Sequence, residues 1–467
     1  MRMIKRTKIV CTIGPASHTE EQLAALVEAG MNVCRLNFSH GTHEDHAELI
    51  RMIRSVAEKT GEPLTILQDL QGPKIRVAEL PADGVQLEAG KEVVFTTGIA
   101  TLPKIGVTYP NLHKDVKAGE RLLLDDGLLS VNVLRVEGQD VVCQVIDGGR
   151  LTSHKGLNLP ETKTSISALS DKDRDDVKFG VEQQVDWIAL SFVRSAQDIK
   201  DLRGLIGEAP IRLMAKIEKP EAVEHMDEII AEVDGIMVAR GDLGIEIPAE
   251  KVPVIQKILI EKCLRAAKPV IVATQMLDSM IRNPRATRAE VSDIANAVID
   301  HTDATMLSGE TASGAHPLEA VQIMSATIRE AEASRYDDLE AKADPENVTE
   351  EERLTNLAAM LAKPSGAKAI LVATMTGQAA RLVSRYRPEL PIFAAVPNER
   401  VRHQLNLSWG VHAFVIPTCQ TLAELLQAAC TQVMQQGFLQ TGDEVILVAG
   451  EPLGESGHVN LVEVRKV

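Results

Sequence analysis

Aromatic residues, paired cysteines and long apolar runs are scarce in this chain of 467 residues, and each scarcity excludes a class of protein. Aromatic side chains make up 3% of the sequence, so its cores must be built mainly from Val, Ile, Leu, Ala and Met. The six cysteines form no CxxC pair, which favours reduced thiols in a cytoplasmic protein, and we expect Cys11 and Cys34 in the core. No run approaches the ~18 apolar residues of a membrane helix, so no membrane partner is expected.

An excess of positive charge is also missing. The 50 Lys and Arg residues face 66 Asp and Glu residues, giving a net charge of −16 at pH 7. This balance excludes a general nucleic-acid binder, which needs a cationic surface, but it allows a local cationic pocket for an anionic metabolite. Two phosphate-binding motifs are absent as well. There is no GxxxxGK[ST] loop, because residues 84–92 (GVQLEAGKE) have the wrong spacing, and no GxGxxG follows a strand.

What the sequence does contain is a regular alternation of short apolar strands and amphipathic helices. Eight strands are predicted, each followed by a helix, at residues 8–14, 32–38, 64–70, 186–192, 212–218, 236–239, 269–275 and 304–310. Eight such units favour a closed (β/α)8 barrel of the α/β class. An open, doubly wound sheet is the alternative. We favour the barrel because polar residues follow nearly every strand instead of gathering at one crossover point.

Two interruptions divide the chain into domains. Between about residues 74 and 160, strand-like runs and turns such as Asp125-Asp126-Gly127 predict a small all-β insertion. Residues 336–352 are rich in Asp and Glu and predict a linker, after which a smaller α/β pattern follows. The predicted domains are a first part of the barrel at 1–72, an all-β domain at 73–165, a second part of the barrel at 166–340 and a C-terminal α/β domain at 341–467.

The segment 212–244 carries the polar residues of greatest chemical interest. Lys216 and Glu218 lie two apart on one predicted strand and therefore point to the same face. Asp242 follows the next parallel strand, so the three side chains can converge. Two carboxylates without a nearby His or Cys favour Mg2+, and a lysine beside that ion could neutralise charge on a transferred phosphoryl group. A structural ion pair between Lys216 and Glu218 explains the same spacing.

In barrels of this kind the active site lies at the carboxyl ends of the strands. Collecting the polar residues at those positions gives Arg35, Asn37, Ser39, His40, Asp69, Lys216, Glu218, Arg240, Asp242, Thr274, Ser308 and Glu310. Loop capping explains any one of them more easily than it explains the whole set. His40, His43 and His46 lie close together, but no matching ligands follow, so we expect solvent-facing histidines at a helix start instead of a zinc site.

Six motifs in order along nearly the whole chain closely resemble those of the pyruvate kinases. They are TKIVCTIGPA at 7–16, NVCRLNFSHG at 32–41, DLQGPKIR at 69–76, MVARGDLG at 237–244, ATQMLDSM at 273–280 and LSGET at 307–311. The resemblance implies an enzyme of glycolysis that transfers the phosphoryl group of phosphoenolpyruvate to ADP, giving pyruvate and ATP. It also implies that the all-β domain is a mobile lid, that the C-terminal domain is an effector domain, and that the enzyme is a homotetramer.

The same resemblance assigns roles motif by motif. Glu218 and Asp242 would hold Mg2+, for which Mn2+ can substitute. The residues implied to act on the substrate are Arg35 on its phosphate, Lys216 on the phosphoryl group in flight, and Gly241, Asp242 and Thr274 on its carboxylate. The residues implied to face the nucleotide phosphates are Asn37, Ser39, His40, Arg76 and Lys155. Protonation of the enolate would run through Thr274, with a water chain reaching Ser308 and Glu310.

One motif departs from the family in a way that concerns K+. Many pyruvate kinases carry Asp-Thr-Lys-Gly-Pro-Glu where this chain has DLQGPK at 69–74. Leu70 thus replaces a hydroxyl that helps to bind K+, and Lys74 replaces the acid, so we predict turnover that does not need K+. Asn37, Ser39 and Asp69 remain as ligands of a monovalent cation. The alternative is that Lys74 simply points into solvent.

Three further interpretations complete the predictions. The loop 374–378 (TMTGQ) lacks the Ser/Thr richness of a sugar-bisphosphate site, so fructose bisphosphate is not expected as activator, whereas a monophosphate or a nucleotide is compatible. The alternative enzyme is a metal-dependent barrel aldolase or lyase acting on pyruvate-like acids. Such an enzyme needs neither Lys216 nor the all-β domain. The alternative to an enzyme is an inactive regulatory relative, which should have lost members of the site.

Overall fold

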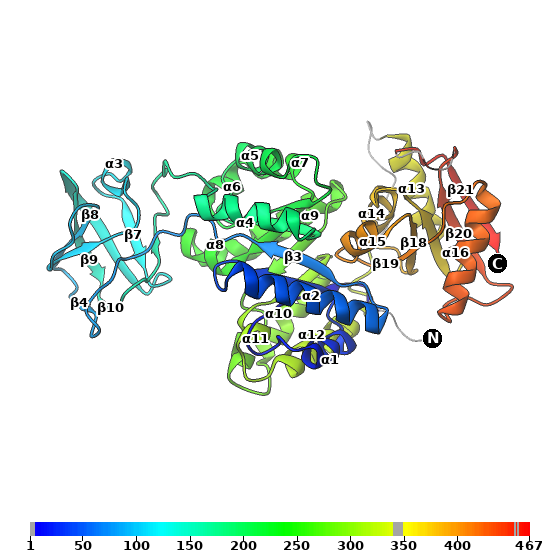
Figure 1. Cartoon of the computed structure of the whole chain (residues 1–467), viewed down its shortest axis with the longest axis horizontal. Coiled ribbons are helices and arrows are strands. Elements are labelled where there is room, and N and C mark those ends of the chain that lie inside the picture. Colours follow the sequence, from blue (N-terminus) through cyan, green and yellow to red (C-terminus); the bar gives the residue numbers. More distant parts are fainter. Residues whose placement is uncertain (1–4, 340–348, 453, 455–456) are drawn as a thin grey trace.

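The computed structural model describes residues 5–339, 349–452, 454 and 457–467. At its centre is a closed barrel of eight parallel strands in the order β1-β16-β15-β14-β13-β12-β3-β2. These strands are β1 (Lys8–Thr12), β2 (Val33–Asn37), β3 (Thr65–Asp69), β12 (Trp187–Leu190), β13 (Arg212–Ile217), β14 (Gly235–Ala239), β15 (Val270–Ala273) and β16 (Ala304–Leu307). The predicted (β/α)8 barrel is confirmed (Figure 1).

Helices cover the outside of the barrel, and several begin at strong capping residues. Thr42 and Ser170, for example, each form a capping box with the residue three positions later, which satisfies otherwise unbonded N–H groups. The helices of the barrel are α1 (Glu20–Ala29), α2 (His43–Thr60), α4 (Asp171–Glu182), α5 (Ala196–Ile206), α6 (Pro220–Glu224), α7 (Met226–Glu232), α8 (Arg240–Glu246), α9 (Val252–Arg265), α10 (Arg288–Ile299), α11 (Gly309–Ala312) and α12 (Pro317–Glu332).

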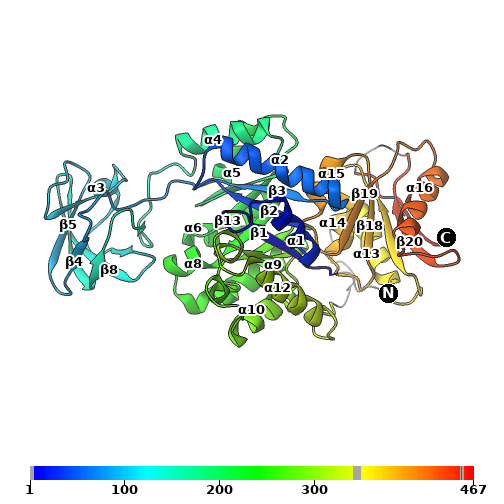
Figure 2. The ribbon, with the colours of Figure 1, turned by 60° about the horizontal axis from the view of Figure 1, so that its bottom comes forward.

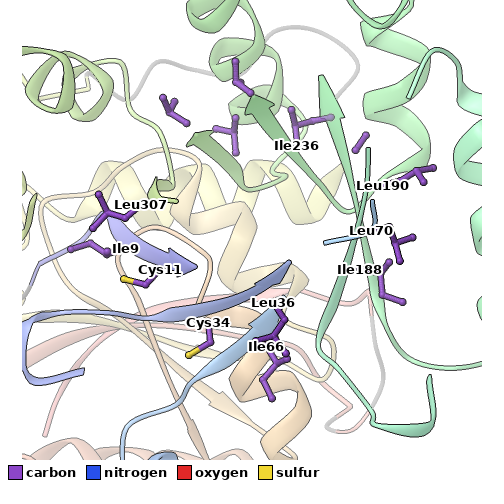
Figure 3. Packing of buried hydrophobic residues seen from close by; sticks show 14 of the residues in the cluster. Ile9, Cys11, Cys34, Leu36, Ile66, Leu70, Ile188, Leu190, Ile236 and Leu307 are labelled. Atoms are coloured by element: carbon purple, nitrogen blue, oxygen red, sulfur yellow. The ribbon is translucent and has the colours of Figure 1, made fainter. Parts of the chain in front are cut away.

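The barrel has two hydrophobic layers because successive strand residues point to opposite faces. The outer layer lies between strands and helices and contains Cys11, Cys34 and Ile188, so both cysteines are core residues as predicted (Figure 3). The inner layer fills the barrel with side chains such as Met237. Leu407, from the C-terminal part of the chain, belongs to this inner layer and is fully buried.

The all-β domain lies at one end of the molecule, and the C-terminal domain lies at the other (Figures 1 and 2). The main sheet of the all-β domain has the order β11-β7-β8-β9-β5-β6, and a two-stranded sheet pairs β10 with β4. The strands are β4 (Val85–Leu87), β5 (Glu92–Thr96), β6 (Lys104–Gly106), β7 (Arg121–Leu124), β8 (Leu129–Glu137), β9 (Asp140–Asp147), β10 (Gly149–Leu151) and β11 (Leu157–Asn158), with one helix, α3 (Leu112–Asp115). This domain encloses a hydrophobic core of its own.

The C-terminal domain is a five-stranded sheet in the order β19-β18-β17-β20-β21, in which only β21 runs antiparallel to its neighbour. Its elements are α13 (Glu350–Leu361), β17 (Ala369–Ala373), α14 (Gln378–Ser384), β18 (Ile392–Val396), α15 (Glu399–Leu405), β19 (Val411–Val415), α16 (Leu422–Gln435), β20 (Glu444–Ala449) and β21 (Leu461–Lys466). Apolar clusters lie on both faces of this sheet, so the predicted α/β domain is confirmed.

Two local predictions were wrong. The acidic stretch predicted as a linker supplies the first turn of α13, where Glu350, Glu351 and Glu352 follow the cap Thr349; acids at a helix N-terminus are favoured by the helix dipole. Residues 340–348 of that prediction lie outside the described residues. The single helix expected after the predicted strand at 212–218 is two short helices, α6 and α7, that meet at His225. Among the described residues, no helix combines the length and apolarity needed to cross a bilayer.

Candidate active site

A group of buried charges occupies the carboxyl ends of β2, β3 and β13. Asp69, which is 1% exposed, lies between two cations. Arg35 Nε donates to Asp69 Oδ2 over 2.6 Å, and Lys216 Nζ lies 3.4 Å from Asp69 Oδ1. Asn37 and Asp69 are register partners on neighbouring strands, so Asn37 lies beside this group. The structure thus brings together residues from three separate strands at one end of the barrel, as the sequence predicts.

Electrostatic pairing keeps these buried groups ionised. Burial alone would raise the pKa of Asp69, but Lys216 and Arg35 outweigh burial and hold that pKa below its usual value. Burial alone would lower the pKa of Lys216, yet Asp69 and Glu218 raise it above the ordinary value. Asp69 is therefore a carboxylate and Lys216 an ammonium group at neutral pH, which supplies fixed positive charge at the mouth of the barrel.

Lys216 and Glu218 do form the ion pair of the structural interpretation, with Lys216 Nζ 2.9 Å from Glu218 Oε1. The other oxygen of Glu218 accepts from the Phe192 N–H over 2.8 Å. Burial raises the pKa of Glu218, and Asp242 raises it further, while Lys216 opposes both. The two carboxylates therefore repel each other, and a divalent cation between Glu218 and Asp242 would neutralise that repulsion. Two carboxylates in this arrangement fit Mg2+.

The carboxylates of Glu218 and Asp242 are too few to enclose an ion alone. Within the part of the chain that the structure describes, no three His, Cys, Asp or Glu side chains cluster as a metal site. Mg2+ commonly keeps water molecules and substrate oxygens as ligands, so a two-carboxylate site open to the cleft is consistent with it. Asp242 lines that cleft together with Lys74 and Asp126 of the all-β domain.

Thr274 has a backbone conformation that a β-branched residue rarely adopts. Its φ is +69°, and that of Gln275 is +56°. Thr274 Oγ1 accepts from the Gly241 N–H over 2.7 Å, and the Thr274 carbonyl accepts from Arg240 Nη2 over 2.9 Å. Arg240 is itself paired with Asp293 at 2.7 Å. These contacts fix the Thr274 hydroxyl beside Gly241 and offset the strain, which is typical of a functional position.

Comparison with known proteins decides the family. Residues 4–321 match the barrel domain of pyruvate kinase, and residues 352–465 match the alpha/beta domain of pyruvate kinase. The chain belongs to the pyruvate kinase family. It is a phosphotransferase that moves the phosphoryl group of phosphoenolpyruvate to ADP, and this excludes the aldolase and regulatory alternatives.

Several pyruvate kinases are similar over the full length of this chain. The pyruvate kinase of Geobacillus stearothermophilus is 45% identical over 100% of this chain and 81% of its own length. That of Clostridium acetobutylicum is 41% identical over 99% of this chain and 100% of its own length. A crystal structure of a pyruvate kinase from Cryptosporidium parvum superposes with a TM-score of 0.93 at 38% identity, covering 99% of this chain and 96% of that one.

Ser308 and Glu310 lie at the end of β16, near the strand that leads to Thr274. Both oxygens of Glu310 bind backbone groups: Oε1 accepts from the Leu277 N–H over 3.0 Å, and Oε2 accepts from the Ser308 N–H over 2.7 Å. Glu310 is 2% exposed. In this pyruvate kinase fold Glu310 therefore ties the strand-end loop after β15 to that after β16 and fixes the position of Ser308.

The predicted nucleotide residues divide between the barrel and the all-β domain. Asn37, Ser39 and His40 follow β2, and Asn37 Oδ1 accepts from the Ser39 N–H over 3.2 Å. Arg76 and Lys155 belong to the all-β domain. Arg76 donates to the His154 carbonyl over 2.9 Å, and Lys155 pairs with Asp125 at 2.7 Å. No hydrogen bond or ion pair among the described residues joins the two groups.

The structure separates the two residues of the K+ motif. Leu70 is 1% exposed and packs in the outer barrel core. Lys74 is exposed and lines the cleft, where a Cβ added to Gly156 would lie 3.9 Å from its Cε. Arg35 and Lys216, and not Lys74, are the cations that pair with Asp69.

Sequence reasoning missed one residue of the site and misjudged another. Ser191 Oγ accepts from Lys216 Nζ over 2.8 Å and lies 2.7 Å from the Leu70 carbonyl, to which it donates. Ser191 follows β12, so the strand-end rule could have found it. His46 was predicted to face solvent, but it is 8% exposed and stacks on Phe38 at 4.0 Å between ring centroids, because an aromatic neighbour shields it.

Proposed function

We propose that the buried group around Lys216 carries out phosphoryl transfer. The observation that supports this is the position of Lys216, held between Asp69 and Glu218 at the strand ends with Asp242 alongside. Glu218 and Asp242 would hold Mg2+, or Mn2+ in its place, and the bound ion would neutralise charge on the substrate oxygens. Lys216 stabilises charge on the phosphoryl group between donor and acceptor, and Arg35 binds the substrate phosphate.

Substrate orientation and the final proton transfer fall to the other side of the site. Thr274 and the backbone N–H groups of Gly241 and Asp242 take the substrate carboxylate. Because the Gly241 N–H is bonded to Thr274 Oγ1, the carboxylate exchanges for that hydroxyl. Thr274 then delivers a proton to the enolate, with Ser308, held by Glu310, continuing the path towards water.

We assign the nucleotide phosphates to the opposite walls of the cleft. Asn37, Ser39 and His40 face them from the barrel, and Arg76 and Lys155 face them from the all-β domain acting as a lid. Closure of the lid would bring both sets to one ligand and would exclude water from the transferring group.

We also propose that turnover does not need K+. The buried Leu70 offers no oxygen from its side chain, and Lys74 brings a positive charge to the cleft that contains Asp242. Asn37, Ser39 and Asp69 could still bind a monovalent cation, so K+ could stimulate without being required.

One assay tests the reaction and the cation together. Pyruvate formation from phosphoenolpyruvate and ADP is measured with Mg2+ in K+-free buffer, and then again after KCl is added. Turnover that ignores KCl supports the reaction and the role of Lys74. Turnover that appears only with KCl keeps the reaction and refutes that role. No turnover in either buffer would refute the site assignment.

Domain boundaries and assembly are part of the same proposal. We place the boundaries at 1–72, 73–165, 166–340 and 341–467, supported by the separate cores of the all-β and C-terminal domains. The unpaired cysteines support a cytoplasmic protein, and the family resemblance supports a homotetramer.

The pocket beside Thr374 contains no Lys or Arg among its described lining residues, which disfavours fructose bisphosphate as activator. A titration that shows strong activation by fructose bisphosphate would refute this last point.

A further inference from the structure

A buried carboxylate outside the proposed site links the lid to the barrel. Glu246 is the last residue of α8, and its side chain is 1% exposed. Its Oε1 accepts from Asn158 Nδ2 over 2.8 Å and from Lys219 Nζ over 2.8 Å. Its Oε2 is also buried and receives no hydrogen bond from the described residues. Neither phosphoryl transfer nor proton delivery uses Glu246 as described above.

The two donors come from opposite sides of the cleft. Asn158 belongs to β11 of the lid, and β11 pairs with β7, so a force on Asn158 acts on the main sheet of the lid. Lys219 follows Glu218 directly in the barrel. The lid also approaches α8 at Gly127, which lies between β7 and β8: a Cβ added there would lie 3.8 Å from Cγ2 of Ile245 on α8.

The position of Glu246 on α8 connects this link to Asp242. Glu246 lies four residues after Asp242, one helical turn along the same short helix. One carboxylate therefore connects the lid, the helix that carries Asp242 and the residue next to Glu218. Because the side chain is buried and charge-paired, it can transmit a small displacement instead of absorbing it.

We propose that Glu246 is a positioning residue that couples the place of the lid to the geometry of Asp242 and Glu218. The proposal rests on the assignment of those two carboxylates as the metal ligands. When the lid shifts, Asn158 moves the Glu246 carboxylate, and α8 and Lys219 carry the movement to the two ligands. Closure of the lid over the nucleotide thus adjusts the metal site on the far wall of the cleft.

The test combines metal binding with hydrogen exchange, neither of which depends on turnover. Mn2+ binding to the free enzyme is measured by electron paramagnetic resonance for Asn158→Ala, Glu246→Ala and the double variant. Exchange is followed in peptides covering α8 and β7. Asn132→Ala, in β8 of the lid sheet, and Glu250→Ala, an exposed acid shortly after α8, are the matched controls.

We expect Glu246→Ala to weaken Mn2+ binding about tenfold, because α8 and Lys219, which adjoin the two proposed ligands, lose the carboxylate that holds them. Asn158→Ala, which leaves the barrel intact, should speed exchange in α8 as well as in β7. The double variant should be no worse than Glu246→Ala alone, because both act through one link. The controls should change neither quantity.

Two outcomes separate this inference from the function on which it rests. If Asn158→Ala speeds exchange in the lid but leaves α8 and Mn2+ binding unchanged, the coupling is refuted while the metal assignment stands. If the wild-type enzyme binds Mn2+ and Glu218→Gln binds it equally well, the metal assignment is refuted and the coupling to that site falls with it. Additive effects in the double variant would also overturn the single shared link.

Discussion

The two ends of the barrel bury charged groups with opposite results. At the carboxyl ends of the strands, Asp69 and Lys216 are buried and yet stay ionised, because each faces opposite charges. At the other end, Lys8 is 1% exposed, donates to the Val411 carbonyl over 2.8 Å and forms no ion pair with any described residue. Burial lowers the pKa of Lys8 to about 8 and raises that of Asp186 to about 7.

This difference teaches that burial alone does not fix the charge of a side chain. Where oppositely charged partners lie within about 4 Å, they offset the desolvation penalty and the group keeps its charge. Lys8 has no ion-pair partner among the described residues, and the Asp186 carboxylate has the Ile66 N–H at 2.8 Å and the His403 ring at 3.8 Å beside it. Neither set of neighbours offsets burial, so each pKa moves towards neutrality. The first arrangement lies at the candidate active site, at the mouth of the barrel. The second belongs to the interface where the C-terminal domain closes the barrel with Leu407.

The largest effect should come from a substitution at the carboxyl ends of the strands. Lys216→Ala removes the ammonium group that we propose stabilises the transferred phosphoryl group, so kcat should fall by roughly 1,000-fold, as when a charge that stabilises phosphoryl transfer is lost. Circular dichroism should show that the fold persists. Lys178→Ala, an exposed lysine on α4, is the control and should leave kcat unchanged. Near-normal turnover of Lys216→Ala would reduce the group to a structural ion pair.

At the opposite end of the barrel, which the C-terminal domain covers, a substitution should change stability and not turnover. Leu407→Ala removes a fully buried side chain from the inner barrel core, and we expect the free energy of unfolding to fall by ~3 kcal/mol. Urea denaturation measures this, and kcat per folded molecule should stay near that of the wild type. Leu357→Ala, at a side chain that is 49% exposed, should change stability by less than ~0.5 kcal/mol. A large loss of kcat with unchanged stability would contradict the division between the two ends.

The smallest effect concerns pH. The pKa of Lys8 is about 8 in the folded protein against 10.5 as its ordinary value, so the unfolded chain binds more protons between these pH values. The free energy of unfolding should therefore rise as pH increases from about 8 to 10.5. The same gain should be lost as pH is lowered back through 8. The contribution of Lys8 is at most roughly 3 kcal/mol.

Lys8→Met isolates that contribution. Urea denaturation at several pH values from 7 to 10 should give a flatter pH dependence for the variant than for the wild type. Both proteins share Lys5 and the remaining titratable groups, so the difference between the two curves reports on Lys8. Parallel curves would show that Lys8 keeps its charge in the folded protein, and the contrast between the two ends would disappear.

Much of the candidate active site was predictable because it follows from local periodicity. The alternation of strands and helices predicts the barrel, and the rule that parallel strands end together predicts that Lys216, Glu218 and Asp242 converge. Asp69 was predicted at the site as well, but its place between two cations was not. Ser191 was missed although it follows a strand in the same way.

The sequence by itself determined the eight-strand pattern, the inserted all-β domain, the C-terminal domain and the set of strand-end residues, because periodicity and turn residues act over a few neighbouring positions. Tertiary structure alone decided the rest: the left-handed Thr274 held by Arg240, the link from Asn158 to Glu246, and Leu407 inside the barrel. Each of these joins segments that lie 34 residues or more apart in the chain. Their contacts depend on where the folded chain places side chains, and no local pattern encodes that placement.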